Sequence, residues 1–358
     1  ATPRLRVAVG QILSGSRFGD VAQAFVEGRF APGALSRDER RVLETLTADK
    51  KDQEAMPRAV RLEVPDWLLP RLEATFGEAL EAELAAMDGE ATLDLRVNTL
   101  RCNREEALQA LARDGLRAEL TRLSPWGLRL PGRQPVTACT AFKDGLVEIQ
   151  DEGSQLVVAM FGARPEMRVL DYCAGAGGKT LAIAMMMQNR GHIVACDVSV
   201  PRLDGAVKRL RRAGIHNAER HLLVPGDKWA KRRAGSFDRV LVDAPCTGTG
   251  TWRRNPDARV RLAEDDLREL TVKQAEILDR AAALVRPGGR LVYATCSILN
   301  DENRDQITAF LSRHPEFALA LPDAEEVPQA FAASSLLSLT PAQNGTDGFF
   351  AAILERKE

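Results

Sequence analysis

Residues 167–180, MRVLDYCAGAGGKT, form the stretch that decides the fold class. The run 167–172 has the length of a short buried strand, and the run 178–189 has the pattern of a helix. Between them, Gly175 and Gly177 let the backbone approach a ligand closely, just before a helix N-terminus. The stretch therefore predicts a strand, a ligand-binding turn and a helix.

The same rhythm continues to residue 295. Strand-like runs alternate with helix-like runs, and such alternation builds a parallel, doubly wound sheet. The later strands are expected at 192–197, 220–224, 237–243, 290–295 and 348–356, and the later helices at 201–214, 265–285 and about 300–314. We expect an α/β fold whose ligands bind at the carboxyl ends of the strands.

Three regions are expected along the chain. Residues 1–62 have the short amphipathic patterns of a helical appendage. Residues 63–145 combine a strand-like run at 95–100 with a helix-like run at 104–115, which predicts a small α/β domain. The main domain is expected at 146–358.

Composition indicates a folded, soluble protein, since 45% of the 358 residues are hydrophobic and 28% are charged. The six cysteines form no C-x-x-C pair and the four histidines share no metal-ligand spacing, so no metal site is expected. The sequence shows no secretory-type apolar run at its N-terminus and no apolar run of membrane-spanning length. We expect a cytoplasmic protein with reduced thiols, and nothing demands more than a monomer.

The Gly-rich turn discriminates between cofactors. A phosphate-binding loop, G-x-x-x-x-G-K-[ST], matches at Gly178, Lys179 and Thr180 but has Cys173 in place of its first glycine. The dinucleotide pattern G-x-G-x-x-G fails because its sixth place is Thr180. Asp171 would repel a phosphate, whereas it would attract the ammonium group of S-adenosylmethionine. We therefore expect S-adenosylmethionine as the cofactor.

Two further aspartates follow the next strands. Asp197 is placed to accept hydrogen bonds from both ribose hydroxyls, and Asp227 is placed to reach an adenine edge. Each one alone is more often a cap or turn residue, but with Asp171 they form a series of three at successive strand ends. The rival interpretation is a nucleoside triphosphatase that uses Lys179, Thr180 and Asp243.

Two cysteines end the last two parallel strands. Cys246 lies in DAPCTGTG, which begins at Asp243, and Cys296 lies in ATCS, which begins at Ala294. The two are 50 residues apart in sequence, but adjacent parallel strands would bring both into one pocket. The remaining thiols are expected to be buried and inert: Cys102, Cys139, Cys173 and Cys196.

The charge is unevenly distributed. The whole chain carries −1, but residues 201–261 hold fifteen Lys or Arg against six acids, a net +9. So large a local excess favours a surface that binds a polyanion such as nucleic acid. Trp252, which precedes Arg253 and Arg254, either stacks on a base or packs at a helix start.

These motifs together resemble those of the RNA (cytosine-C5)-methyltransferases. The resemblance rests on DYCAGAGGKT, Asp197, the GD pair at 226–227, DAPCTGTG with RRNPD at 253–257, ATCSILNDEN at 294–303, LRVNTL at 95–100, EIQDEGSQLV at 148–157 and DGFFAAILER at 347–356. It covers about residues 65–358 and is strongest for the bacterial 16S ribosomal RNA branch, the RsmB type. That branch usually carries a full NusB-like helical domain, so residues 1–62 are expected to be a shortened or different version.

The resemblance implies a Rossmann-like methyltransferase fold with a seven-stranded, mostly parallel sheet. It assigns to Cys296 the attack on C6 of cytosine, which activates C5 for methylation, and to Cys246 the release of the product. Asp243 is expected to hydrogen-bond the cytosine edge, and Lys179 to contact the base or to pair with Asp243. The expected cofactor-binding residues are Asp171, Cys173, Ala174, Gly175, Gly177, Gly178, Lys179, Asp197, Arg202, Asp227 and Asp243.

The expected partner is RNA, most directly ribosomal RNA with a single-stranded or flipped cytosine, because pairing hides C6. The domain at 63–145 is expected to bind this RNA or to link the two flanking regions. Transfer RNA or another RNA is the alternative substrate. An RNA-binding relative without activity is a further alternative, but it would have no reason to keep two strand-end cysteines.

Overall fold

The computed structural model describes residues 3–27, 32–48, 56–224, 226–323 and 327–358. The chain divides into two compact units, Ala1–Val64 and Pro65–Glu358. Within the described residues, no helix combines the length and apolar character needed to cross a membrane.

The first unit is helical in its described parts, with α1 (Pro3–Leu13), α2 (Phe18–Ala24), α3 (Arg37–Ala48) and α4 (Arg58–Arg61). Its core is formed by Ala8, Ile12, Val21, Phe25, Leu35 and Leu43. The Arg4 guanidinium donates hydrogen bonds to the carbonyls of Gly33 and Ala34, so α1 is held to the segment before α3. Its likeness to a NusB-type domain stays a prediction.

The second unit opens with α5 (Leu69–Phe76), a 3-10 turn (η2, Gly77–Ala79) and α6 (Leu80–Asp88). A four-stranded antiparallel sheet follows, in the order β2-β3-β1-β4. Its elements are β1 (Leu93–Val97), α7 (Arg104–Arg113), β2 (Glu119–Leu120), β3 (Gly127–Leu130), η3 (Val136–Ala138), α8 (Thr140–Lys143) and β4 (Val147–Ile149). We call this the small sheet. Asn103 and Glu106 form a capping box that starts α7.

The two faces of the small sheet differ because side chains alternate along a strand. Leu95 and Val97 of β1 face the apolar core that includes Leu111 of α7. Asp94 and Arg96 alternate with them, and both are buried. The second face is therefore charged, and its partners lie in the larger part of the unit.

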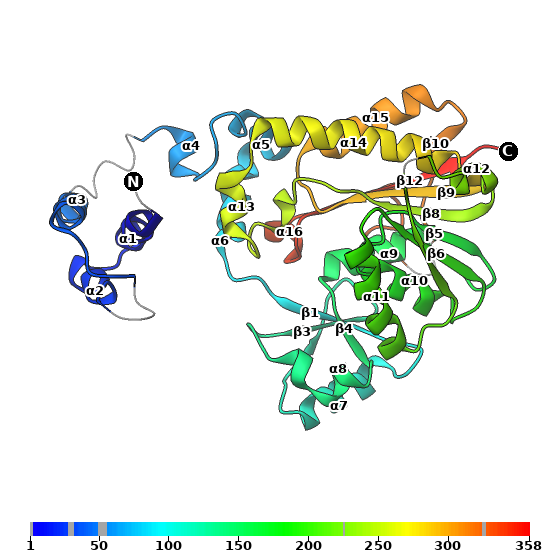
Figure 1. Cartoon of the computed structure of the whole chain (residues 1–358), viewed down its shortest axis with the longest axis horizontal. Helices are drawn as coiled ribbons and strands as arrows, with labels where there is room; N and C mark the ends of the chain where they lie inside the picture. Colours follow the sequence, from blue (N-terminus) through cyan, green and yellow to red (C-terminus); the bar gives the residue numbers. More distant parts are fainter. Residues whose placement is uncertain (1–2, 28–31, 49–55, 225, 324–326) are drawn as a thin grey trace. The chain divides into compact units, whose positions relative to one another are not determined.

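The large sheet has the order β10-β12-β9-β8-β5-β6-β7, and β11 pairs with β12 (Figure 1). Its strands are β5 (Arg168–Asp171), β6 (His192–Asp197), β7 (Ala218–Leu222), β8 (Phe237–Asp243), β9 (Val285–Thr295), β10 (Phe317–Leu319), β11 (Leu336–Leu339) and β12 (Phe349–Arg356). The five strands from β9 to β7 are parallel, and β12 is antiparallel to β9. The predicted α/β fold is confirmed. In the described residues the sheet has eight strands, whereas the resemblance implied seven, and the sequence predicted neither β10 nor β11.

Helices cover both faces of the large sheet. Figure 1 shows α14 (Glu264–Ala282) and α15 (Arg304–Arg313) on one side and α9 (Glu152–Phe161), α10 (Gly178–Met186) and α11 (Val200–Ala213) on the other. Neighbouring residues of β8 separate the two cores, because Leu241 packs with α9 and α10 whereas Val240 packs with α14. Shorter elements lie in the loops: α12 (Trp229–Arg232), η4 (Thr249–Thr251), α13 (Pro256–Arg261), η5 (Asn300–Glu302) and α16 (Pro341–Asn344).

Two expected elements differ in detail. The helix expected at about 300–314 is divided into η5 and α15, because Asn303 has φ −113° and ψ −97°, outside the helical range. Strand β9 starts at Val285, before Pro287, whereas the sequence predicted a strand from residue 290.

Candidate active site

The carboxyl ends of β5, β8 and β9 lie side by side. Asp171 at the end of β5 pairs in register with Leu241 of β8, and Asp243 at the end of β8 pairs with Ala294 of β9. The loops that follow β8 and β9 therefore start together, and they carry Cys246 and Cys296. The Sγ atoms of these two cysteines are 3.4 Å apart, at hydrogen-bonding distance for thiols.

Backbone and hydroxyl contacts hold the two cysteine loops together. The Gly250 amide donates to the Cys296 carbonyl at 2.9 Å. The hydroxyls of Thr249 and Ser297 are 3.0 Å apart, and the Ile298 amide donates to the Thr249 hydroxyl at 3.1 Å. The short distance between the thiols is thus supported by the loops themselves.

The surroundings of Cys246 favour its protonated form. The hydrogen bond to Cys296, burial, and the charges of Cys296 and Glu302 raise the pKa of Cys246 well above its usual value. The Cys246 thiol therefore holds its proton more tightly than a free cysteine does.

Lys179 and Asp243 form an ion pair beside the thiols. The Lys179 Nζ is 2.6 Å from an Asp243 carboxylate oxygen and 5.7 Å from the centre of the Phe349 ring. Burial lowers the pKa of Lys179, but the charge and hydrogen bond of Asp243 outweigh it and leave the pKa raised. Lys179 is therefore a permanent cation here. Of the two expected contacts of Lys179, the pair with Asp243 is present, and the contact with a base stays a prediction.

Backbone hydrogen bonds hold the Gly-rich turn against the end of β6, and the turn leaves space for a ligand at Gly175. The Ala174 amide donates to the Cys196 carbonyl at 2.8 Å, and the Gly175 amide donates to Asp197 at 2.9 Å. Gly175 and Gly177 have φ of +55° and +79°, a range that favours glycine. A Cβ on Gly175 would meet no atom within 4 Å, so a ligand can approach the backbone there.

The strand-end acids fit S-adenosylmethionine. Asp171 is fully buried, and one of its oxygens accepts a hydrogen bond from Thr180 at 2.7 Å while the other has no partner among the described residues. Burial raises the pKa of Asp171 to about 7. A cationic ligand group would compensate this unpaired oxygen. The Thr180 hydroxyl is committed to Asp171, which weakens the nucleoside triphosphatase interpretation, since that site needs the hydroxyl for magnesium.

Asp227 and Arg202 border the same edge of the sheet. Asp227 accepts from the Trp229 amide at 2.7 Å and contacts His221 Nε2 at 2.8 Å, and the amide above all lowers the pKa of Asp227. The His221 ring stacks on Trp229 with centroids 4.5 Å apart. Arg202 is exposed in the first turn of α11. Their contacts with adenine or cofactor stay predictions.

Acidic side chains neutralise more of the positive charge of the basic stretch 201–261 than the count of charges along the sequence suggests. Nine of its fifteen cations form ion pairs, several with acids outside the stretch such as Glu148, Asp323 and Asp347. In the described part of the chain, six form no ion pair: Arg202, Lys208, Arg211, Lys228, Lys231 and Arg232. Trp252 is buried under the Arg259 guanidinium, which favours packing over base stacking.

A buried charge cluster next to the Cys246 loop was missed by sequence reasoning. Arg253 and Arg254 each contact both Asp151 and Asp347, at 2.5 to 3.3 Å. Burial and the charges of Asp347 and Asp94 raise the pKa of Asp151 to about 6. The motifs at 148–157 and 347–356 were noted as family features, but the pairing across about 100 residues had no local signal.

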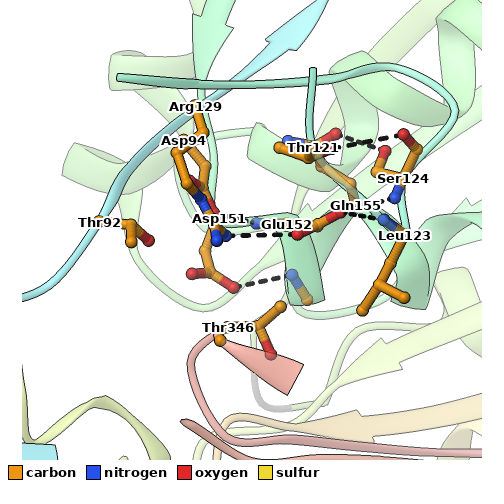
Figure 2. A network of polar contacts seen from close by, with 12 residues as sticks. Thr92, Asp94, Thr121, Leu123, Ser124, Arg129, Asp151, Glu152, Gln155 and Thr346 are labelled. Atoms are coloured by element: carbon orange, nitrogen blue, oxygen red, sulfur yellow. Dashed lines mark hydrogen bonds and ion pairs between the residues drawn. The ribbon is translucent and has the colours of Figure 1, made fainter. Parts of the chain in front are cut away.

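Figure 2 shows Asp151 of this cluster near Asp94 and Arg129 of the small sheet and Glu152 of α9. Arg129 of β3 donates to both oxygens of Asp94 at 2.7 and 2.9 Å. Glu152, the first residue of α9, accepts from the amides of Leu123 and Ser124 at 2.6 and 2.7 Å. The charged face of the small sheet is thus joined to the start of α9. We call these contacts the charged joint.

This fold and this site define an S-adenosylmethionine-dependent methyltransferase: a Gly-rich turn and acidic strand ends beside a pair of thiols. The model of the 16S rRNA methyltransferase RsmB/F family matches residues 158–355, and the ferredoxin-like domain model of RsmF/B-like methyltransferases matches 64–137. The chain belongs to the RsmB/F family.

Individual relatives agree. Ribosomal RNA small subunit methyltransferase B of Photorhabdus laumondii is 34% identical over 298 residues, which cover 82% of this chain and 66% of the relative. A probable methyltransferase B of Synechocystis is 35% identical over 313 residues, covering 85% and 69%. The crystal structure of PH0851 superposes with a TM-score of 0.79 at 31% identity, covering 99% of this chain and 81% of that one. The chain spans about two thirds of the length of the curated relatives.

Proposed function

We propose that this chain methylates C5 of a cytosine in 16S ribosomal RNA through a covalent bond between Cys296 and C6. The observation that carries the proposal is the 3.4 Å pair of strand-end thiols beside the Lys179–Asp243 ion pair. A fold of this kind binds its ligand at that edge of the sheet. The family to which the chain belongs narrows the substrate to ribosomal RNA.

Cytosine C5 is too weak a nucleophile to take a methyl group directly. The Cys296 thiolate adds to C6 and moves electron density onto C5, which then bonds to the methyl group. Loss of the C5 proton restores the double bond and expels the Cys296 sulfur. S-adenosylmethionine, when bound, supplies the methyl group as an electrophilic sulfonium. The turn at 173–179 with Asp197, Arg202 and Asp227 would hold it.

The ion pair positions the base. The Asp243 carboxylate accepts a hydrogen bond from the exocyclic amine of cytosine, and Lys179 fixes that carboxylate and contributes a positive charge beside the base. Cys246 keeps its proton and assists release of the product. The unpaired cations of the basic stretch other than Arg202 contact the flanking phosphates of a flipped-out or single-stranded target. A ribosomal RNA substrate implies a cytoplasmic enzyme, and we propose that it works as a monomer.

The test is methyl transfer to unmodified 16S rRNA with S-adenosylmethionine, mapped by bisulfite sequencing, with transfer RNA as the parallel substrate. One protected cytosine in 16S rRNA is the expected result. If only transfer RNA contains a protected cytosine, the proposed chemistry stands and the proposed substrate is wrong. Cofactor binding without any protected cytosine, or magnesium-dependent ATP hydrolysis, would overturn the proposal.

A further inference from the structure

Glu302 lies beneath the Cys246 loop, six residues after Cys296. Its side chain is fully buried. One carboxylate oxygen accepts a hydrogen bond from the Thr247 amide at 2.8 Å, and the other accepts from the Thr247 hydroxyl at 2.5 Å. The carboxylate therefore holds the residue that follows Cys246.

Gln274 of α14 holds the other side of the same loop. Its Nε2 donates to the carbonyl of Pro245 and to the Glu302 carboxylate, both at 2.9 Å. The residues before and after Cys246 are thus fixed by two buried side chains. The Cys246 thiol is left facing Cys296.

Asn303, the next residue, does the same for the Cys296 loop. Its Nδ2 donates to the Ser297 carbonyl at 2.9 Å, and its Oδ1 accepts from the Thr295 hydroxyl at 2.6 Å. Consecutive residues of one short turn therefore fix the flanks of both cysteines. Movement of this turn would change the distance between the thiols.

Glu302 also acts through its charge. All of these contacts are donated to the carboxylate by neutral groups, the Thr247 amide and hydroxyl and the Gln274 amide, as an ionised acceptor requires. A buried carboxylate in such surroundings opposes a second negative charge nearby. The hydrogen bond and charge of Cys296, burial, and the charge of Glu302 favour the protonated Cys246 thiol, and they outweigh the Gly248 backbone amide, which favours the thiolate.

We propose that Glu302 is a positioning residue that keeps the proton on Cys246 and holds this thiol against Cys296, so that Cys246 donates a hydrogen bond to the departing sulfur. The inference rests on the proposed function. In the release step, water removes the C5 proton, the C–H electrons form the C5–C6 double bond, and the C6–S bond breaks onto the Cys296 sulfur. That sulfur leaves as a thiolate, whose negative charge balances the proton taken by water, and it accepts a hydrogen bond from the Cys246 thiol.

The first test needs no RNA. In a Cys296→Ser background, alkylation of Cys246 by iodoacetamide is followed against pH by peptide mass spectrometry. Glu302→Gln should lower the midpoint of alkylation by about one pH unit, because it removes a nearby negative charge. Glu302→Asp, which restores the charge, and Thr247→Val, which removes only a hydrogen bond, should keep the original midpoint. An unchanged or higher midpoint in Glu302→Gln would overturn the proposal.

The second test uses the otherwise unaltered enzyme with RNA and S-adenosylmethionine. Glu302→Gln should accumulate a covalent protein–RNA species on denaturing gels, about tenfold above wild type, and Glu302→Asp should rescue release. If Cys246→Ala accumulates the species while Glu302→Gln releases normally, Glu302 has no part in release. If no variant forms the species, the proposed function fails, and the alkylation midpoints still decide the electrostatic role of Glu302.

Discussion

The backbones of Gly250 and Gly348 touch directly: the Gly348 amide donates to the Gly250 carbonyl at 2.8 Å. Gly250 follows the Cys246 loop, and Gly348 precedes β12, the antiparallel neighbour of β9. Because the Gly250 amide also donates to the Cys296 carbonyl, three segments meet at one point. A Cβ on Gly250 would lie 2.7 Å from the Gly348 carbonyl carbon, so this meeting requires glycine.

Gly250→Ala should therefore damage both stability and activity. The new methyl group has to displace backbone, and overpacking of this kind costs about 1–3 kcal/mol of unfolding free energy. Urea denaturation and methyl-transfer assays measure the two effects. The matched control is Gly205→Ala in α11, where a Cβ would lie 3.8 Å from Ala176 Cβ and helix propensity adds about 0.5–1 kcal/mol. Equal behaviour of the two variants would contradict the prediction.

Variants of Cys296 and Cys246 should be blocked at different steps of the reaction. Cys296→Ser should form no covalent species and reduce methyl transfer to background, because no thiolate can add to C6. Cys246→Ala should still allow addition but release slowly, with turnover lower by about 100-fold, the usual effect of removing one hydrogen-bond donor to a developing negative charge. Denaturing gels with labelled RNA distinguish the two, and cofactor binding should be unchanged in both. A covalent species in Cys296→Ser would reverse the roles.

Asp171 predicts a pH dependence of the protein without cofactor. Its pKa is about 7 in the folded chain against 3.8 for an ordinary aspartate, so folding takes up a proton between these values. Stability then falls as pH rises from about 4 to about 7, by on the order of 4 kcal/mol. Asp171→Asn should remove this slope and be the more stable protein at pH 8, as urea midpoints across the range will show. If the urea midpoints of the two proteins change with pH in the same way, the raised pKa of Asp171 is refuted.

Arg253 and Arg261 belong to the same basic stretch but should differ in effect. Arg253 is buried between Asp151 and Asp347, so Arg253→Met leaves two carboxylates with less compensation and should cost about 3 kcal/mol or more. Arg261 pairs with Asp257 on the surface, so Arg261→Met should cost less than about 1 kcal/mol. Chemical denaturation of both variants gives the comparison. A small loss in Arg253→Met would mean that the cluster adds little to stability.

Salt dependence should separate unpaired from paired cations. Lys208 and Arg211 of α11 are exposed and form no ion pair in the described structure. Replacing both by Gln should reduce the slope of log affinity for RNA against log salt by roughly 1–2, since each phosphate contact adds about 0.7–0.9. The control replaces Arg268 and Arg280, which pair with acids on their own helix. If α11 lies outside the RNA footprint, the two double variants will have the same slope.

The strand ends could be predicted from sequence because two simple rules combine. The alternation of strands and helices fixes a parallel sheet, and its carboxyl ends gather in one place, which brought Asp171, Asp243, Cys246 and Cys296 together before any coordinates. The sequence left two contacts open for Lys179, one with the base and one with Asp243. The structure shows the second as an ion pair of 2.6 Å.

Contacts between distant elements could not be predicted. Gln274 lies in a long amphipathic helix and looks like any polar residue of its exposed face, yet it is fully buried against Glu302. The charge count along residues 201–261 could not show which cations are paired, because the acids that neutralise Arg239, Arg253 and Arg254 come from other segments. The run LLSL at residues 336–339 is too short to indicate a strand from the sequence. It forms β11 because it pairs with the edge of β12.

The charged joint has a practical consequence for dissecting the protein. A truncation that starts at residue 146 would strip Glu152 of its amide donors on Leu123 and Ser124, and would remove the Arg96 guanidinium from the Gly178 carbonyl at the head of α10. The truncation would therefore expose both the buried carboxylates of the charged joint and the cofactor-binding turn to water. Residues 65–358 should therefore melt as a single cooperative block, and fragment studies of RNA recognition need that block whole.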